Sequence, residues 1–221
     1  MRNLAQPRVL ILATIAALAT TLACYHRLSF WLNRPASVWY LEAVMFLCSI
    51  ILWSFVFAWH TQYAHRPVFT LKIDPRLFAI VTVAGIVVAM AFHLFLDPSL
   101  RLKTPEEYPA DVKQWLAMAL FSLAFNQLFF VFAPFAWLIR LFQNRRMAIC
   151  LTVLFGVIVL AIKYQSSTIP IPSLLLAALL AVRIGMGFLS VSFYVRGGVL
   201  LSWWWTLLIE ARNLLDVAGH S

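Results

Sequence analysis

The segment Phe125-Asn126-Gln127-Leu128-Phe129-Phe130-Val131-Phe132 places two adjacent side-chain amides inside a long apolar run. A membrane-spanning helix would normally carry leucine or valine at these positions, because an amide in hydrocarbon is costly unless a partner satisfies its hydrogen bonds. We therefore expect Asn126 and Gln127 to face protein rather than lipid. Pro134 follows in the same run and cannot donate to the carbonyl of Phe130, which predicts a kink just past the pair.

The composition of the chain is that of a membrane protein. Of its 221 residues, 63% are hydrophobic and 11% are charged, and the mean hydropathy is +0.89. A soluble domain has about 45–50% apolar and about 25% charged residues. We predict an all-α polytopic integral membrane protein, in a bacterial-type inner (plasma) membrane. The net charge of +9 fits basic residues that meet anionic headgroups next to the spans, and no nucleic-acid partner is expected.

The apolar runs predict about seven transmembrane helices. Their ranges are 9–23, 39–58, 77–96, 115–139, 147–162, 173–194 and 199–215. For the first run, a cleaved signal peptide is the alternative to a transmembrane helix. Residues 1–114 would hold three N-terminal helices and a polar loop, and residues 115–221 a four-helix membrane core, all in one membrane domain. A small excess of Lys and Arg on the side of the N-terminus predicts that this terminus is cytoplasmic.

Three motifs in the second half resemble those of the CPBP family, which comprises CAAX proteases and bacteriocin-processing or Abi-type proteins. Asn126-Gln127-Leu128-Phe129-Phe130-Val131 resembles the family's E-E-x-x-F-R motif, and Leu154-Phe155-Gly156-Val157-Ile158-Val159-Leu160 is similar to L-F-G-x-x-H-L. Tyr194-Val195-Arg196-Gly197-Gly198-Val199-Leu200 resembles the Y-x-R-T-G-S-L turn, which leads into a helix with H-x-x-x-N. The resemblance implies a CPBP-like helical bundle in the C-terminal half.

The reactive residues of the family are replaced in this chain. In the family, paired glutamates activate water or bind a metal, and histidines and an asparagine orient the reacting centre. The resemblance assigns the family's motif positions, the arginine included, to Asn126, Gln127, Val131, Val159, Leu207 and Ala211, the last two by count from Gly198. An amide cannot act as a general base, and valine or leucine cannot ligate a metal. We therefore expect a catalytically inactive scaffold without a metal or other cofactor.

Arg183 and Glu210 are the charges well inside the last two predicted spans. Ions in such positions usually pair or line a wet cavity. We expect a salt bridge between the sixth and seventh helices, with a polar binding cavity as the alternative. Asn126, Gln127, Arg183 and Glu210 form the candidate binding site. Besides the lipid bilayer, the expected partner is another membrane protein, a hydrophobic peptide or a lipid.

A divergent intramembrane CAAX-type endopeptidase is the alternative function, with residues such as Glu210 and His93 in catalytic roles. It would need two carboxylates and a histidine to converge, and only Glu210 is clearly inside the membrane in this half. His60 and His65 are five apart, which is not the spacing of a helical zinc pair. We expect these two histidines to be solvated at the membrane interface.

Overall fold

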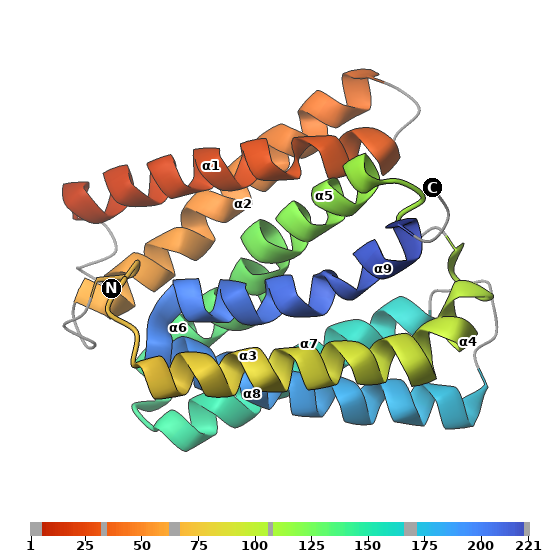
Figure 1. The fold of residues 1–221 in the computed structure, drawn as a ribbon. Coiled ribbons are helices and arrows are strands. Elements are labelled where there is room, and N and C mark those ends of the chain that lie inside the picture. Colours follow the sequence, from red (N-terminus) through yellow and green to blue (C-terminus); the bar gives the residue numbers. More distant parts are fainter. Residues whose placement is uncertain (1–5, 32–34, 62–66, 106–107, 166–171, 219–221) are drawn as a thin grey trace.

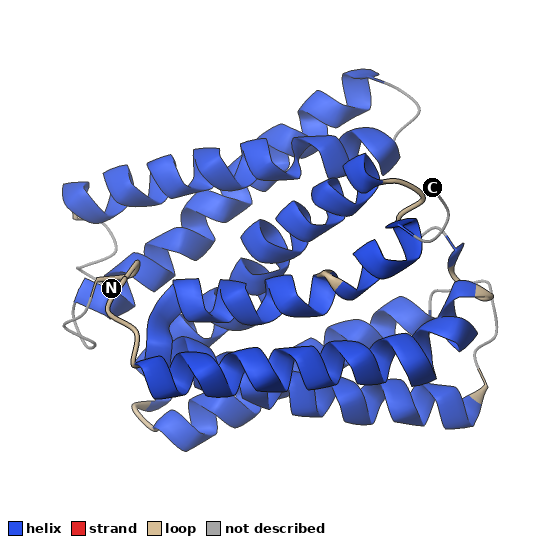
Figure 2. Cartoon of the chain, in the orientation of Figure 1, coloured by secondary structure: helices blue, strands red, loops and turns tan. Residues whose placement is uncertain are grey.

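The computed structural model describes residues 6–31, 35–61, 67–105, 108–165 and 172–218, and every regular element within these ranges is a helix (Figures 1 and 2). Six segments are long and apolar enough to cross a membrane: Pro7–Phe30, Val38–Trp59, Pro75–Arg101, Val112–Phe142, Arg145–Lys163 and Leu175–Leu215. The prediction of an all-α, polytopic membrane fold is confirmed.

The helices are numbered along the chain, and η denotes a π-helix, in which an N–H group bonds to the carbonyl five residues earlier. They are α1 (Pro7–Trp31), α2 (Pro35–Trp59), α3 (Pro75–Ala91), η2 (Phe92–Leu96), α4 (Asp97–Arg101), α5 (Val112–Phe121), η4 (Ser122–Asn126), η5 (Leu128–Phe132), α6 (Ala133–Phe142), α7 (Arg145–Gln165), α8 (Ser173–Glu210) and α9 (Arg212–Ala218). The segments η2, η4 and η5 continue the helices that precede them, so that 75–101 and 112–142 each form one membrane crossing.

Helix α8 folds back on itself at Gly198, where the backbone is not helical (φ 77°, ψ −169°). Glycine adopts this conformation without the steric penalty of a Cβ atom. Trp205 Nε1 donates a hydrogen bond to Ser190 Oγ at 3.1 Å, although 15 residues of straight helix would separate the two by about 22 Å. The two limbs of α8, 173–197 and 198–210, therefore lie antiparallel (Figure 1). The last of the six apolar segments thus crosses twice, in agreement with the predicted number of about seven.

Helices α1 and α2 pack closely along a stripe of α1. The buried residues of the stripe recur at every third or fourth position: Val9, Ala13, Ala17, Thr21, Cys24 and Leu28. Small side chains let membrane helices approach closely. In lipid no hydrophobic effect drives helices together, so their association depends on such van der Waals packing. Trp53 Nε1 of α2 also donates to Thr20 Oγ1 at 3.0 Å. The N-terminal apolar run is therefore a packed helix of the bundle.

An aromatic cluster joins α2, η5, α6 and the first limb of α8. Tyr194 lies at its centre, with ring centroids 4.6 Å from Phe132 and 5.7 Å from Trp59. His60 is 5% exposed, and its Nε2 lies 3.1 Å from the Tyr194 hydroxyl oxygen. The expectation of a solvated His60 is wrong, because the end of α2 packs against α8 instead of ending in water. His65 lies outside the described residues.

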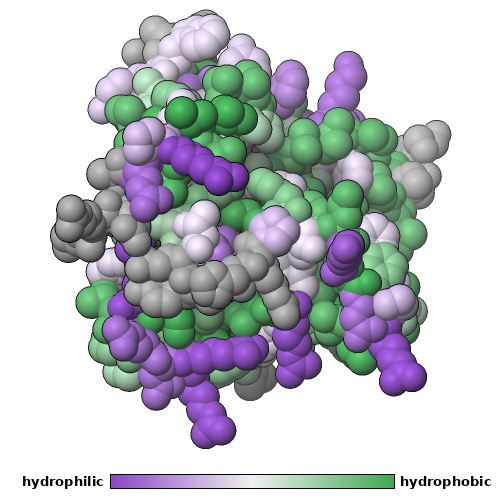
Figure 3. All heavy atoms as spheres, turned by 90° about the vertical axis from the view of Figure 1, so that its left-hand side faces the viewer, coloured by the Kyte–Doolittle hydropathy of each residue, from purple (hydrophilic) through white to green (hydrophobic). Residues whose placement is uncertain are grey.

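Polar side chains collect at the two ends of the bundle. One end carries the exposed residues Lys72, Arg76, Arg145 and Arg196, and Figure 3 shows hydrophilic side chains between apolar ones on this face. The opposite end holds α4, α9 and the start of α5 (Figure 1). The stretch between the two ends is apolar and is formed by the helices that are long enough to cross a membrane. This is the arrangement of an integral membrane protein.

Candidate functional site

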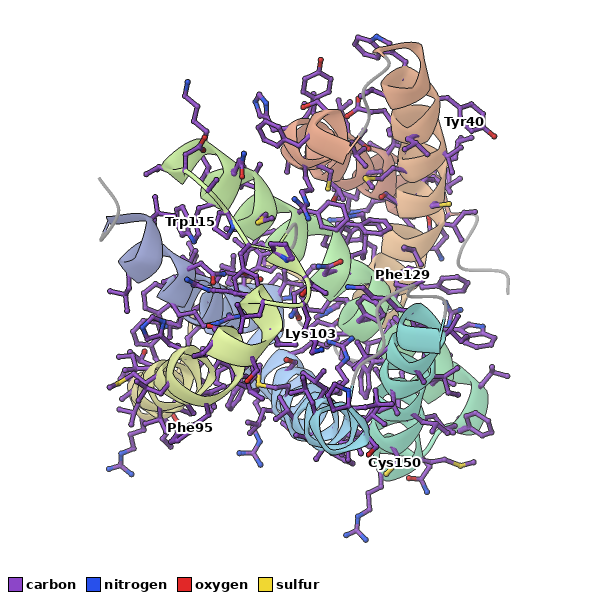
Figure 4. All side chains as sticks on the ribbon, turned by 90° about the vertical axis from the view of Figure 1, so that its right-hand side faces the viewer. Tyr40, Phe95, Lys103, Trp115, Phe129 and Cys150 are labelled. Carbon is purple, nitrogen blue, oxygen red and sulfur yellow. The ribbon has the colours of Figure 1, made fainter. Side chains whose placement is uncertain are left out.

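A polar cavity lies inside this apolar bundle and consists of two chambers. The inner chamber has a volume of about 160 Å³ and the outer chamber about 560 Å³. The two lie side by side, because they share part of their lining; the shared residues are Ser122, Asn126, Phe130, Gly156, Arg183 and Glu210. Arg27, Thr104 and Tyr108 line only the outer chamber, which therefore lies toward the α4 end. Figure 4, drawn from that end, shows the helices around a centre that α4 and Lys103 overlie.

Two π-helical segments carry the amide pair into the cavity. The N–H of Gln127 bonds to the carbonyl of Ser122, and the N–H of Ala133 bonds to that of Leu128. Each π turn inserts one extra residue, which rotates the side chains that follow it around the helix axis. The second π turn ends directly before Pro134, whose missing N–H we expected to disturb the helix. The two π segments thus lie on either side of Gln127, upstream of Pro134.

Both amides face the protein interior, as expected. Asn126 lines both chambers and Gln127 lines the inner one. Asn126 Nδ2 donates to Ser122 Oγ at 3.5 Å, and Gln127 Oε1 accepts from Ser202 Oγ at 3.0 Å. Among the described residues, the other N–H groups of the two amides and the Asn126 oxygen have no protein partner. Their hydrogen-bonding capacity is therefore directed at the contents of the cavity.

Arg183 lies deep in the bundle between an aromatic ring and a glycine. Its Cζ is 4.5 Å from the centroid of Phe130, and a Cβ atom on Gly156 would come within 3.2 Å of its Nη2. Ten residues of helix separate Arg183 from the start of α8 at Ser173, which corresponds to a depth of about 15 Å. The glycine thus provides the room that the guanidinium occupies.

The expected salt bridge between Arg183 and Glu210 is not formed within the described residues. The Arg183 guanidinium turns toward Phe130 on η5, whereas Glu210 sits at the end of α8, beside the Ser122 hydroxyl. Glu210 Oε2 accepts a hydrogen bond from Asn213 Nδ2 at 3.5 Å. The two charges line the same cavity without pairing, which is the alternative that the sequence left open.

A hydrogen-bonded cluster closes the rim at the α4 end. Arg212 Nε lies 2.9 Å from Asp97 Oδ2, and the Tyr108 hydroxyl donates to Asp97 Oδ1 at 3.0 Å. Burial raises the pKa of Tyr108 above its ordinary value, and the charge of Asp97 raises it further. Trp115 Nε1 donates to the carbonyl of Glu210 at 2.9 Å. These contacts hold α4, the start of α5, the end of α8 and α9 together around the outer chamber.

The positions assigned by the family resemblance are only partly brought together. Val131 lines the inner chamber and Val159 the outer one, but Leu207 and Ala211 line neither. Thr206 and Glu210 line the cavity in their place. Leu207 and Ala211 therefore do not face the cavity, whereas the residues one position earlier do, since one residue turns a helix by about 100°. The spacing of four residues is kept.

Several hydroxyl residues of the cavity were not among the predicted site residues; they are Ser122, Thr152, Ser190 and Thr206. A signal for them is present in the sequence, because each lies four residues, or three for Ser190, from another cavity residue on the same helix. The pairs are Ser122 with Asn126, Thr152 with Gly156, Gly187 with Ser190, and Thr206 with Glu210. Such spacing places both members on one helix face.

Two further observations bear on chemistry at the site. Within the described ranges, no group of three or more His, Cys, Asp and Glu side chains is arranged to hold a metal ion. His93, the histidine considered for the endopeptidase, lies on η2 and lines neither chamber.

Comparisons with known proteins leave the family open. No family model matches the chain. No curated protein and no solved structure matches it either. The resemblance to the CPBP family therefore stays a prediction from the motifs.

Proposed function

We propose that this chain is a catalytically inactive, CPBP-like membrane protein that binds the polar part of a membrane partner or lipid in its interior cavity. The observation that carries the proposal is a surplus of hydrogen-bond donors. Arg183 and the amide N–H groups of Asn126 and Gln127 face one cavity, and the described residues offer them few acceptors. Unsatisfied polar groups inside a bilayer are costly, so their presence here supports a site that water or a ligand fills.

The residues at the reactive positions of the family support binding rather than proteolysis. Asn126 and Gln127 cannot take a proton as a general base near neutral pH, and Val159 has no polar atom. A binding protein can use the same cavity without these functions. In this proposal the chain uses its helical scaffold and cavity for binding and cleaves no bond.

The proposal also predicts from which side of the membrane the cavity is reached. In a bacterial-type inner membrane with the N-terminus in the cytoplasm, α1 carries the chain outward once, so Arg27 and the α4 end lie on the outer side. The outer chamber would then be reached from the non-cytoplasmic leaflet. A membrane protein, a hydrophobic peptide or a lipid in that leaflet is the proposed partner.

One observation favours the alternative of a divergent CAAX-type endopeptidase. Glu210 is a carboxylate in the cavity beside the Ser122 hydroxyl. Among the described lining residues it is the single carboxylate, whereas the family motif uses a pair. Cleavage of a prenylated or ordinary membrane peptide by the purified protein, abolished by Glu210→Gln, would establish this alternative.

The double substitution Asn126→Leu with Gln127→Leu tests the proposed function. Thermal stability is measured in detergent, and lipid or partner retained from native membranes is measured per folded molecule by mass spectrometry. Because each unsatisfied amide costs about 1–3 kcal/mol, we expect stability to hold or rise while retention falls. Gln114→Leu is the control, since this amide accepts from the N–H of Ala110 outside the cavity. Loss of stability with unchanged retention would mean that the amides only hold the helices together.

A further inference from the structure

We infer that the group held in the cavity is an anion of the phosphate type, an inference that rests on the proposed binding function. The outer chamber is lined by four cationic side chains, Arg27, Lys163, Arg183 and Arg212, and one carboxylate, Glu210. Asp97 pairs with Arg212 behind this lining. Within the described lining, cationic side chains therefore outnumber carboxylates, and Arg27 and Lys163 also make further contacts. A low-dielectric wall strengthens the attraction of such charges for an anion.

Arg183 is the residue that makes the site specific for an anion. Its guanidinium lies over the Phe130 ring, and no described carboxylate pairs with it. A cation about 15 Å below the start of its helix is costly without a counter-charge, by the helix rise. The ring satisfies the face of the guanidinium, but the N–H groups at its edge require acceptors. Two oxygens of a phosphate match that edge, because the guanidinium donates two parallel hydrogen bonds.

The neighbouring polar groups favour an anion over a cation. The amide N–H groups of Asn126 and Gln127 line the same space, and the Gln127 oxygen is already occupied by Ser202. The Thr206 hydroxyl donates to the carbonyl of Ser202 at 3.0 Å, and the Ser122 hydroxyl lies beside Glu210, so the donors that face the space are the amide N–H groups and Arg183. Donors therefore outnumber fixed acceptors around the inner chamber. Its volume of about 160 Å³ is larger than the roughly 30 Å³ share of one water molecule.

An apolar groove adjoins the polar cavity. It has a volume of about 380 Å³ and lies among side chains of α2, η5, α6 and α7, including Phe129 and Phe155. The ring of Phe155 is 6.3 Å from that of Phe130, which lines both polar chambers. Figure 4 shows Phe129 on the side of the bundle near α2. The rings of Phe130 and Phe155 thus separate the proposed anion site from a groove that suits an acyl chain. Both the phosphate group of a lipid and free phosphate therefore fit this region.

The test measures binding of three probes to the full chain in detergent by native mass spectrometry. The probes are dioleoyl phosphatidic acid, dioleoylglycerol, which has the same chains without the phosphate, and inorganic phosphate. Arg183→Gln removes the proposed anion contact. Arg145→Gln is the matched control, because it removes an exposed charge at the opposite end. Arg183→Lys keeps the charge but loses the paired donors, and it serves if the glutamine variant does not fold.

We expect phosphatidic acid to bind at least about ten-fold more tightly than dioleoylglycerol, and Arg183→Gln to remove that difference. Arg145→Gln should bind like the unchanged chain, and Arg183→Lys should lie in between. Inorganic phosphate that displaces the lipid completely would identify a free anion as the ligand; failure to displace it would identify a lipid headgroup. Equal binding of the two lipids, or unchanged binding by Arg183→Gln, would overturn the inference. If the unchanged chain and Arg183→Gln both bind dioleoylglycerol, and only the double variant Asn126→Leu, Gln127→Leu loses it, the proposed binding function stands and the inference of an anion fails.

Discussion

The guanidinium carbon of Arg183 lies 4.5 Å from the centroid of the Phe130 ring, which joins the first limb of α8 to the π segment η5. A cation over an aromatic face is stabilised by about 0.5–2 kcal/mol, most strongly where water is excluded. The contact fixes the guanidinium at the junction of the two chambers while its edge stays available to the cavity. The pair thus explains how an arginine is held inside an apolar bundle without a carboxylate.

Gly156→Leu should displace this guanidinium. A Cβ atom at Gly156 would approach Arg183 Nη2 to 3.2 Å, and the rest of the side chain would fill the cavity. Overpacking of this kind costs about 1–3 kcal/mol, so the thermal midpoint should fall and the affinity for phosphatidic acid should fall with it. Gly185→Leu is the control, because nothing lies within 4 Å of a Cβ atom there. If both variants bind and melt alike, Arg183 does not depend on Gly156 for its place.

Gly198→Ala should destabilise the reversal of α8. The residue has φ 77° and ψ −169°, a backbone region that is essentially restricted to glycine and costs another residue about 1–3 kcal/mol. The free energy of unfolding in mixed micelles should fall by that amount. The matched Gly185→Ala replaces a helical glycine in open space and should be neutral or stabilising by up to about 1 kcal/mol. An unchanged stability of the Gly198→Ala variant would contradict the structure of the turn.

Tyr108→Phe should reveal the rim cluster through its pH dependence. Loss of the hydrogen bond to Asp97 should lower the free energy of unfolding by about 1–3 kcal/mol at neutral pH. The pKa of Tyr108 is raised above its ordinary value of 10.0, so the unfolded phenol ionises at a lower pH than the folded one. The contribution of Tyr108 to the free energy of unfolding is therefore fully present below pH 10 and declines above it. A difference between the two proteins that stays constant or grows above pH 10 would contradict this assignment.

Asn126→Glu combined with Gln127→Glu should not create a protease. The two carboxylates would restore the glutamate pair of the motif that the chain resembles, but Val159 and Leu207, which the resemblance places at the histidine positions, would still lack an imidazole. Peptide cleavage should remain at background for prenylated and unmodified membrane peptides. Turnover in this variant would show that the remaining cavity residues suffice for catalysis.

Most of the fold was predictable from the sequence, because apolar length and turn residues determine where a membrane helix begins and ends. The predicted reversal around Arg196-Gly197-Gly198 is present, with Gly198 as the non-helical residue. The inward direction of Asn126 and Gln127 followed from the cost of an amide in lipid alone. Neither prediction depended on long-range packing.

The site was predictable only in part, because its details depend on which neighbour each side chain meets. Arg183 and Glu210 share a cavity but do not pair, since Phe130 and Gly156 offer the guanidinium another place. The π turns before Pro134 change the helix phase, and no periodicity rule contains them. A count along a helix also could not show that Thr206 and Glu210, rather than Leu207 and Ala211, face the cavity.

The accessibility of position 126 tests the central claim, a polar cavity inside the apolar bundle that is reached from the α4 end. In a variant without Cys24, Cys48 and Cys150, Asn126→Cys is exposed in sealed vesicles to a charged, membrane-impermeant thiol reagent. Val83→Cys is the control, because Val83 is 62% exposed on the apolar face of α3. We predict labelling of position 126 only from the side that carries α4, and no labelling of position 83. No labelling of position 126 from either side would contradict the account.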